Sequence, residues 1–410
     1  MSQTASPQLT PVAPESRIVL LDILRGFALF GVLWSNLNDH YGTTEAANGL
    51  DRALAWIQQW LIEERFYTLL GFLFGIGFAI QLRRADARDA DARNIFVRKM
   101  FVLLIIGVLH GLLIWRGDIL TEYALLGFLL LAYRKLSTRG LLLAAAATYV
   151  GLQYLVKIGF GLTQMTYLFR RPPNPLAAWA YAHGSYTQVM PIRVQEYLAW
   201  YETWGFVVFP AFLTLFVLGL WAERTGVLSR VRESRWVGRA FWIAVACAVV
   251  ALLIGDKVYT WWPFARPTGW RDFHFWTLRD VVVGIPDRLL VWGSSAAYAL
   301  GLTFLALRPR AARVLAPLGA VGRMTLTTYL TQSVVCTLLF YGYGLGWYGR
   351  VGFTGMFAIT VVLFACQLAA SAWWTRRFRF GPVEWFWRSL AYGRKQPMTS
   401  AAPSGSAVLP

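Results

Sequence analysis

Two apolar runs joined by a very short polar hinge set the architecture of this chain, in the stretch from Leu103 to Gly127. Each run, with its neighbours, is long enough to cross a bilayer, because a membrane-spanning helix needs about 20 apolar residues. The hinge, Arg116-Gly117-Asp118, is too short for anything but an antiparallel helical hairpin. The sequence therefore predicts two membrane helices that run in opposite directions at this point.

Similar apolar runs recur along all 410 residues, and 57% of the residues are hydrophobic, whereas a soluble domain would have about 45–50%. We therefore expect an all-α fold, a polytopic helical membrane protein with about ten transmembrane helices. The expected segments are a disordered tail (1–16), a transmembrane helical domain (17–375), an amphipathic interfacial segment (376–393) and a second disordered tail (394–410). The three cysteines lie inside apolar runs without metal-ligand spacing, so no metal site is predicted.

The distribution of positive charge predicts the orientation of the chain. The net charge of +18 comes from short basic clusters between apolar runs, which is a membrane orientation signal rather than a nucleic-acid footprint. Of the 39 Lys and Arg residues, 25 fall on one predicted side of the membrane and 13 on the other. Since the richer side faces the cytoplasm, both termini are predicted to be cytoplasmic.

The hairpin also carries ionisable residues, which cost a few kcal/mol each at membrane depth unless they are paired or hydrated. His110, Asp118 and Glu122 would lie near the outer leaflet in this topology, together with Asn36 at the outer end of the first span. A histidine beside a carboxylate is the usual arrangement for a general base, so these four residues are the catalytic candidates. The simpler alternatives are that His110 only bonds two helices together and that Asp118 only caps its helix.

Two further groups of polar residues have both a functional and a structural interpretation. Asp22 and Arg25, toward the cytoplasmic side, would bind an anionic cofactor or simply pair with each other at i,i+3 spacing. Four residues near one face of a later helix would contact substrate or join helices by hydrogen bonds: Thr325, Thr328, Tyr329 and Gln332.

Five stretches between Leu21 and Gly393 carry a family resemblance: LDILRGFALFGVLWSN, FGIGFAIQ, GVLHGLLIWRGDILTEYALLG, GRMTLTTYLTQS and GPVEWFWRSLAYG. Together they resemble the YeiB-like bacterial membrane proteins, the domain-of-unknown-function family 418 (DUF418), which is similar to the transmembrane acyltransferase superfamily. That resemblance implies a multi-pass protein of the bacterial inner (plasma) membrane. It also implies transfer of an acyl group from cytoplasmic acyl-coenzyme A or acetyl-coenzyme A to an envelope glycan or lipid acceptor.

The chain departs from the acyltransferase pattern at one position. Where the bacterial sugar acyltransferases have a histidine, eleven residues after the arginine of the first span, this chain has Asn36. The lysosomal enzyme of that superfamily is similar in having asparagine there and a histidine further along, but His40 is poorly spaced for that role. His110 is therefore the predicted base. The alternative function is a transporter or exporter of a small molecule or lipid, in which the outward polar residues line a path.

Overall fold

The computed structural model describes residues 19–42, 46–86, 90–153, 175–202, 204–227, 236–261 and 278–399. Within these ranges the chain is helical apart from turns, short connections and one isolated antiparallel bridge between Phe378 and Thr399. The predicted all-α class is confirmed. The predicted disordered tail at 1–16 and the end of the chain from 400 onward lie outside the described residues.

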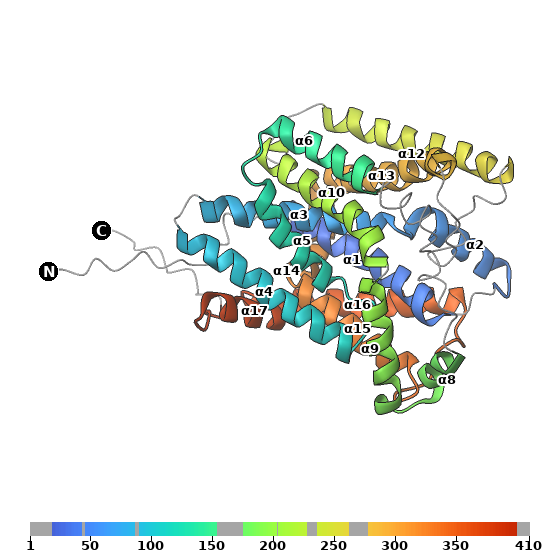
Figure 1. The fold of residues 1–410 in the computed structure, drawn as a ribbon. Coiled ribbons are helices and arrows are strands. Elements are labelled where there is room, and N and C mark those ends of the chain that lie inside the picture. The colour runs from blue at the N-terminus through green and yellow to red at the C-terminus, as the bar shows by residue number, and fades with distance from the viewer. Residues whose placement is uncertain are drawn as a thin grey trace.

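The described helices form one packed bundle (Figure 1). In chain order they are α1 (Val19–Tyr41), α2 (Gly49–Ile57), α3 (Arg65–Asp86), α4 (Ala90–Leu113), α5 (Leu120–Tyr133), α6 (Thr138–Ala146), α8 (Pro175–His183), α9 (Tyr186–Glu202), α10 (Trp204–Arg224), α12 (Trp236–Trp261), α13 (Leu278–Ala306), α14 (Pro309–Arg323), α15 (Thr325–Phe340), α16 (Phe353–Arg377) and α17 (Pro382–Tyr392). Two π-helical segments, Gln58–Ile62 and Ala147–Gln153, extend α2 and α6.

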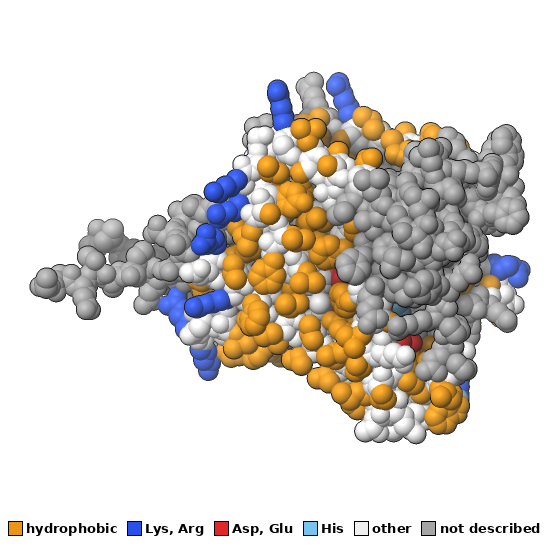
Figure 2. Space-filling model, viewed as in Figure 1, with side chains coloured by type: hydrophobic (Ala, Val, Ile, Leu, Met, Phe, Trp, Pro, Cys, Tyr) orange, Lys and Arg blue, Asp and Glu red, His pale blue; other side chains and the backbone are white. Residues whose placement is uncertain are grey.

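The bundle has the hydrophobic exterior of a membrane protein. Six helical segments of the described chain are long and apolar enough to cross a bilayer: Val19–Tyr41, Gly49–Arg84, Arg93–Leu113, Trp236–Leu253, Arg288–Ala306 and Phe353–Arg377. The apolar helices α5 and α15 are shorter. On the face drawn in Figure 2, hydrophobic side chains are spread over the described surface, and most visible Lys and Arg side chains gather at the left edge, on the side of α17. The count of about ten spans and the cytoplasmic termini stay predictions.

Helix α1 lies in the middle of the bundle, against α3, α14 and α16. Its contact with α14 is close enough to require glycine, because a Cβ on Gly26 would lie 2.0 Å from the Leu318 carbonyl oxygen. Helix α14 is not one of the six membrane-length segments. Its sequence has low overall hydrophobicity and an internal Pro317, so it carries no membrane-length apolar run, and packing on α1 stabilises it instead.

The region before α10 contains two further helices. Part of it, residues 154–174, lies outside the described residues, and the rest forms α8 and α9. Helix α9 contains Pro191 and has no apolar stripe, so its sequence gives little helical signal. Tertiary packing against α4 and α10 supports it.

The predicted amphipathic segment at 376–393 includes the end of α16 and all of α17. Helix α17 docks through a buried carboxylate: Glu384 accepts hydrogen bonds from the backbone N–H groups of Leu326 and Thr327, at 2.6 and 3.1 Å. It therefore caps the N-terminus of α15 from outside that helix. We expected residues 394–399 in a disordered tail. Instead they pack back against the residues just before α17, where the backbone N–H of Arg379 donates a hydrogen bond to the carbonyl of Met398.

Candidate functional site

The site is built on the hairpin of α4 and α5, which pack together around a hinge of residues 114–119. The two helices come very close at Gly107, where an added Cβ would lie 2.4 Å from the backbone nitrogen of Thr121 and 2.9 Å from Asp118 Oδ2. Since only glycine permits this approach, the start of α5 lies directly against α4. The acidic hinge residue is thereby brought to the last turn of α4, where His110 lies.

His110 and Asp118 form a buried pair. The His110 Nδ1 atom lies 2.8 Å from Asp118 Oδ1, and the two residues are only 1% and 3% exposed. An ionised carboxylate can only accept hydrogen bonds, so Nδ1 carries the donated proton and Nε2 of a neutral ring holds the free lone pair. His110 Nε2 is buried and has no hydrogen-bond partner among the described residues. The pair therefore has the geometry of an oriented base whose proton-accepting atom is not engaged.

Asp118 is fixed in place on both sides. Its second oxygen, Oδ2, accepts a hydrogen bond from Thr121 N at 2.8 Å, so it also caps the start of α5. The Tyr329 hydroxyl donates to Gly117 O at 3.2 Å and accepts from Ile119 N at 3.3 Å. One phenol of α15 thus holds both peptide groups that flank the aspartate. Asp118 itself caps the start of α5 and contacts His110 at the same time.

Aromatic rings surround the imidazole. The ring centroids of Tyr329 and Trp115 lie 5.3 and 6.3 Å from that of His110. Trp115 also packs edge-on against His40, at 4.9 Å, so one indole separates the two histidines. Other buried polar atoms on the elements of the site have no hydrogen-bond partner in the described structure: Trp115 Nε1, Tyr123 Oη and Tyr201 Oη. Such atoms are rare in folded proteins, and each needs an explanation such as strain, an ordered water or a catalytic role.

Glu122 is buried near this pair but is bonded to a different element. Its Oε1 accepts a hydrogen bond from Trp200 Nε1 at 2.6 Å, and Thr121 Oγ1 lies 2.9 Å from the Tyr197 hydroxyl. Both partners belong to α9, whose role the sequence analysis missed. The signal that was present is the spacing of Tyr197, Trp200 and Tyr201, which puts three aromatic residues on one helical face.

Helix α9 is anchored to the end of α4 by a buried cation. The Arg193 side chain is completely buried, donates to the carbonyl of Leu113 and packs 5.3 Å from the ring of Tyr186. The Tyr186 hydroxyl donates to the same carbonyl at 2.7 Å. These bonds satisfy a C-terminal carbonyl of α4 and hold α9 beside the hairpin.

Three residues predicted from the first span bond outside this network. Asn36 Oδ1 accepts a hydrogen bond from the Tyr67 hydroxyl. Asp22 and Arg25 form an ion pair at 3.4 Å, and Arg25 also donates to Leu73 O at 3.3 Å. The pairing interpretation therefore describes their geometry, while a catalytic role for Asn36 and a cofactor role for Asp22 and Arg25 stay predictions.

The hydroxyl-rich face of α15 divides into two parts. Tyr329 contacts the hinge, as described above. Gln332 Nε2 donates to Gln367 Oε1 at 2.9 Å, and Gln367 donates to the Thr328 carbonyl at 3.1 Å, which links α15 to α16. Thr325 Oγ1 donates to Gly322 O at the end of the preceding helix, α14. Substrate contact by these four residues stays a prediction.

Comparison with known proteins is consistent with the resemblance noted from the sequence. A family model described as "Protein of unknown function (DUF418)" matches residues 222–394. The chain is 31% identical over 422 residues to YxaH of Bacillus subtilis (strain 168), covering 95% of this chain and 98% of the relative. It is 27% identical over 412 residues to YeiB of Escherichia coli (strain K12), covering 94% and 98%. Neither name states an activity.

Proposed function

We propose a function for this chain from the premise that it belongs to the YeiB-like DUF418 family of membrane proteins. It is a multi-pass enzyme of the bacterial inner membrane that transfers an acyl group to a hydroxyl of an envelope glycan or lipid, with His110 as the general base. The observation that carries this proposal is the buried contact of His110 Nδ1 with Asp118 Oδ1, together with the unpartnered Nε2. Packing alone does not require an imidazole held in one tautomer.

Each residue of the pair has a defined task in this reaction. Acyl-coenzyme A or acetyl-coenzyme A, when bound, would supply the acyl group as a thioester. His110 Nε2 takes the proton from the acceptor hydroxyl as its oxygen forms the new ester bond, and then gives that proton to the departing thiolate. Asp118 keeps the ring oriented and stabilises the imidazolium. A positioned base of this kind contributes about 10²–10⁴-fold in rate.

The acyl donor enters the proposal from the family resemblance alone. A donor site at Asp22 and Arg25, which pair with each other at 3.4 Å, stays a prediction from the sequence. The proposed topology has about ten spans and cytoplasmic termini, which puts the hinge of residues 114–119 at the outer surface. The separation of basic side chains toward the side of α17 supports this orientation (Figure 2).

The test compares envelope extracts of wild-type and deletion strains by mass spectrometry. The expected result is one glycan or lipid species that loses an acyl mass increment in the deletion strain. A transporter would instead leave every acceptor mass unchanged and alter where an unmodified compound accumulates. That outcome would refute the acyltransferase proposal.

Variants then connect the activity to the pair. His110→Gln and Asp118→Asn should each lower acylation by at least about 10²-fold while the protein still inserts in the membrane. His183→Gln is the matched control, because His183 is exposed and lies on α8. If His110→Gln retained full acylation in the complemented deletion strain, His110 would not be the base.

A further inference from the structure

Helix α17 has an exposed apolar face. Phe386 and Leu390 lie four residues apart, which places them on one side of the helix, and each is 50% exposed. Other sides of the helix are bonded to the bundle. Glu384 bonds to α15, and Trp387 Nε1 donates to the carbonyl of Lys99 on α4 at 2.7 Å. The helix is therefore held from within, and Phe386 and Leu390 form its outward face.

Exposed basic residues lie on both sides of α17 in the chain. Arg376 and Arg377 end α16, and Lys395 follows α17. The Arg377 guanidinium lies 4.6 Å from the ring centroid of Trp373, which is itself 52% exposed. Between the first and the last of these basic residues the sequence has one acidic side chain, Glu384, and it is buried against α15. The exposed surface of this segment is therefore basic and apolar together.

The end of α16 marks one edge of the bilayer. This helix is long and apolar enough to cross a membrane, and its last two residues are Arg376 and Arg377. Helix α17 begins five residues later, at Pro382. Its outward face therefore lies within reach of the surface at which α16 leaves the hydrocarbon.

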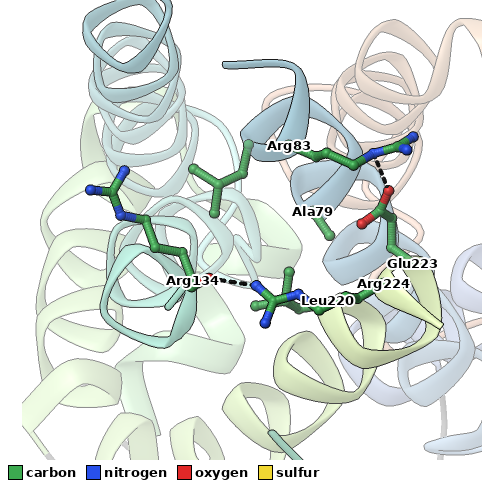
Figure 3. Close-up of a pocket in the computed structure, with 7 residues that line it drawn as sticks. Ala79, Arg83, Arg134, Leu220, Glu223 and Arg224 are labelled. Carbon is green, nitrogen blue, oxygen red and sulfur yellow. Dashed lines mark hydrogen bonds and ion pairs between the residues drawn. The ribbon is translucent and has the colours of Figure 1, made fainter. Parts of the chain in front are cut away.

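The end of α3 beside this region is charged as well. Lys99, whose carbonyl accepts the bond from α17, donates through Nζ to Gln81 of α3 at 3.1 Å. Two residues further along α3, Arg83 pairs with Glu223 of α10 at 2.5 Å. Arg83 and Glu223 line a cavity of about 170 Å³ between the helix ends (Figure 3). Since charged side chains are costly in hydrocarbon, we assign this end of the bundle to a membrane surface.

Helix α17 also completes the start of α15. The N-cap residue of α15, Met324, makes no capping hydrogen bond with its side chain. Glu384 supplies the cap instead, because Oε1 accepts from the backbone N–H groups of Leu326 and Thr327, and Oε2 accepts from the Thr327 hydroxyl at 2.5 Å. Tyr329, whose hydroxyl bonds the hinge, follows within the next turn. The position of α17 therefore acts directly on the first turn of α15.

We propose that the outward face of α17 and the basic residues beside it bind an anionic phospholipid surface, and that this contact keeps Glu384 in place as the cap of α15. An amphipathic helix of this kind buries its apolar face at the boundary of headgroups and acyl chains, while nearby basic side chains attract anionic headgroups. In the orientation proposed above, the surface is that of the cytoplasmic leaflet. Neither the lipid contact nor the cap depends on the proposed acyl transfer, so the test does not measure activity.

The contact with the bilayer is tested on the full chain in lipid nanodiscs. A nitroxide label on Leu390→Cys, in a cysteine-free background, reports hydrocarbon contact through collisions with oxygen and water contact through collisions with a soluble nickel chelate. The label should contact hydrocarbon more in discs of phosphatidylcholine with phosphatidylglycerol than in discs of phosphatidylcholine alone.

One charge substitution and a matched control identify the basic contact. Arg377→Gln should lower the equilibrium constant for docking of α17 in the anionic discs about fivefold, because one cation near such a surface contributes about that factor. Arg350→Gln should leave docking unchanged. Arg350 is also exposed, but it lies beyond the C-terminal end of α15, whereas α17 caps the N-terminal end.

Hydrogen–deuterium exchange of the same samples tests the link to α15. The backbone amides of Leu326 and Thr327 should exchange faster in phosphatidylcholine discs and in Arg377→Gln, and at the wild-type rate in Arg350→Gln. A label that contacts water in both kinds of disc, or hydrocarbon to the same extent in both, would overturn the anionic surface as the partner. Unchanged exchange at the two amides while the label leaves the hydrocarbon would overturn the link between that surface and the cap.

Discussion

The close contact at Gly107 in the hairpin offers a sharp test of how the proposed base is positioned. In Gly107→Ala, the new methyl carbon would lie 2.4 Å from Thr121 N and 2.9 Å from Asp118 Oδ2, whereas ordinary contacts of such a carbon begin at 3.4 Å. The start of α5 must therefore retreat by about 1 Å. Because Thr121 N is itself bonded to Asp118 Oδ2, the aspartate should move with it.

The size of the effect follows from this displacement. A retreat of about 1 Å lengthens the 2.8 Å contact between His110 Nδ1 and Asp118 Oδ1 beyond hydrogen-bonding distance. Misplacement on this scale can cost about 10²-fold in rate. Overpacking lowers the free energy of unfolding by about 1–3 kcal/mol, whereas replacing glycine by alanine inside a helix raises it by about 1 kcal/mol. The net loss of stability is therefore at most about 2 kcal/mol, which is too small to account for the expected loss of activity.

Histidine-selective ¹⁵N NMR can report the displacement directly, because the chain has only four histidines. In the wild-type protein, one buried histidine should be protonated at Nδ1 and not at Nε2, and His110→Gln should remove its signals. Gly107→Ala should shift this histidine toward the Nε2-protonated tautomer and lower acylation in the envelope assay.

Gly319→Ala is the matched control for the glycine substitution. Gly319 also lies within a helix, but the nearest atom to its added Cβ is Ile23 Cγ1 at 3.5 Å, an ordinary contact. This variant should keep the wild-type histidine signals and activity. If Gly107→Ala kept the wild-type tautomer and full activity as well, close contact at Gly107 would not be what positions Asp118.

Three other predictions concern the rest of the fold. Burial raises the pKa of the Glu384 carboxyl, so its stabilising contribution is present below its ordinary pKa of about 4.3 and is lost as the pH rises through the raised value. Glu384→Gln should therefore flatten the fall of the thermal unfolding midpoint over that pH interval. An unchanged slope would point to another group. Arg193→Met should destabilise the chain by about 1–3 kcal/mol in thermal unfolding, because the Leu113 carbonyl loses a buried donor, and a cost no larger than that of an exposed arginine would contradict this. Leu345 and Lys395 are exposed, so each can be replaced by a cysteine in a cysteine-free background. Leu345→Cys should react with an impermeant thiol reagent added from outside, whereas Lys395→Cys should react only after lysis. Labelling of both from one side would refute the proposed topology.

The sequence was informative where apolar length or local spacing determines structure. The short connection between Leu103 and Gly127 predicted the hairpin, and the cost of ionisable groups at membrane depth identified His110 and Asp118. It was uninformative where tertiary contacts determine structure. Helices α9 and α14 lack a membrane-length apolar run, so their packing partners could not be inferred from periodicity. The same limit applies to Glu122, whose bond to Trp200 joins residues 78 positions apart.

Tyr329 illustrates how a residue can be identified from the sequence while its partners cannot. Its position on the hydroxyl-rich face predicted a polar contact, either to substrate or to another helix. In the fold its hydroxyl bonds Gly117 and Ile119, more than 200 residues earlier in the chain. Since both bonds are to main-chain groups, they do not involve the side chains of those two residues, and neither the hinge sequence nor the helix spacing could reveal them. The orientation of Asp118 therefore depends on α15 as much as on the hairpin that contains it, and α15 is in turn capped by Glu384 of α17.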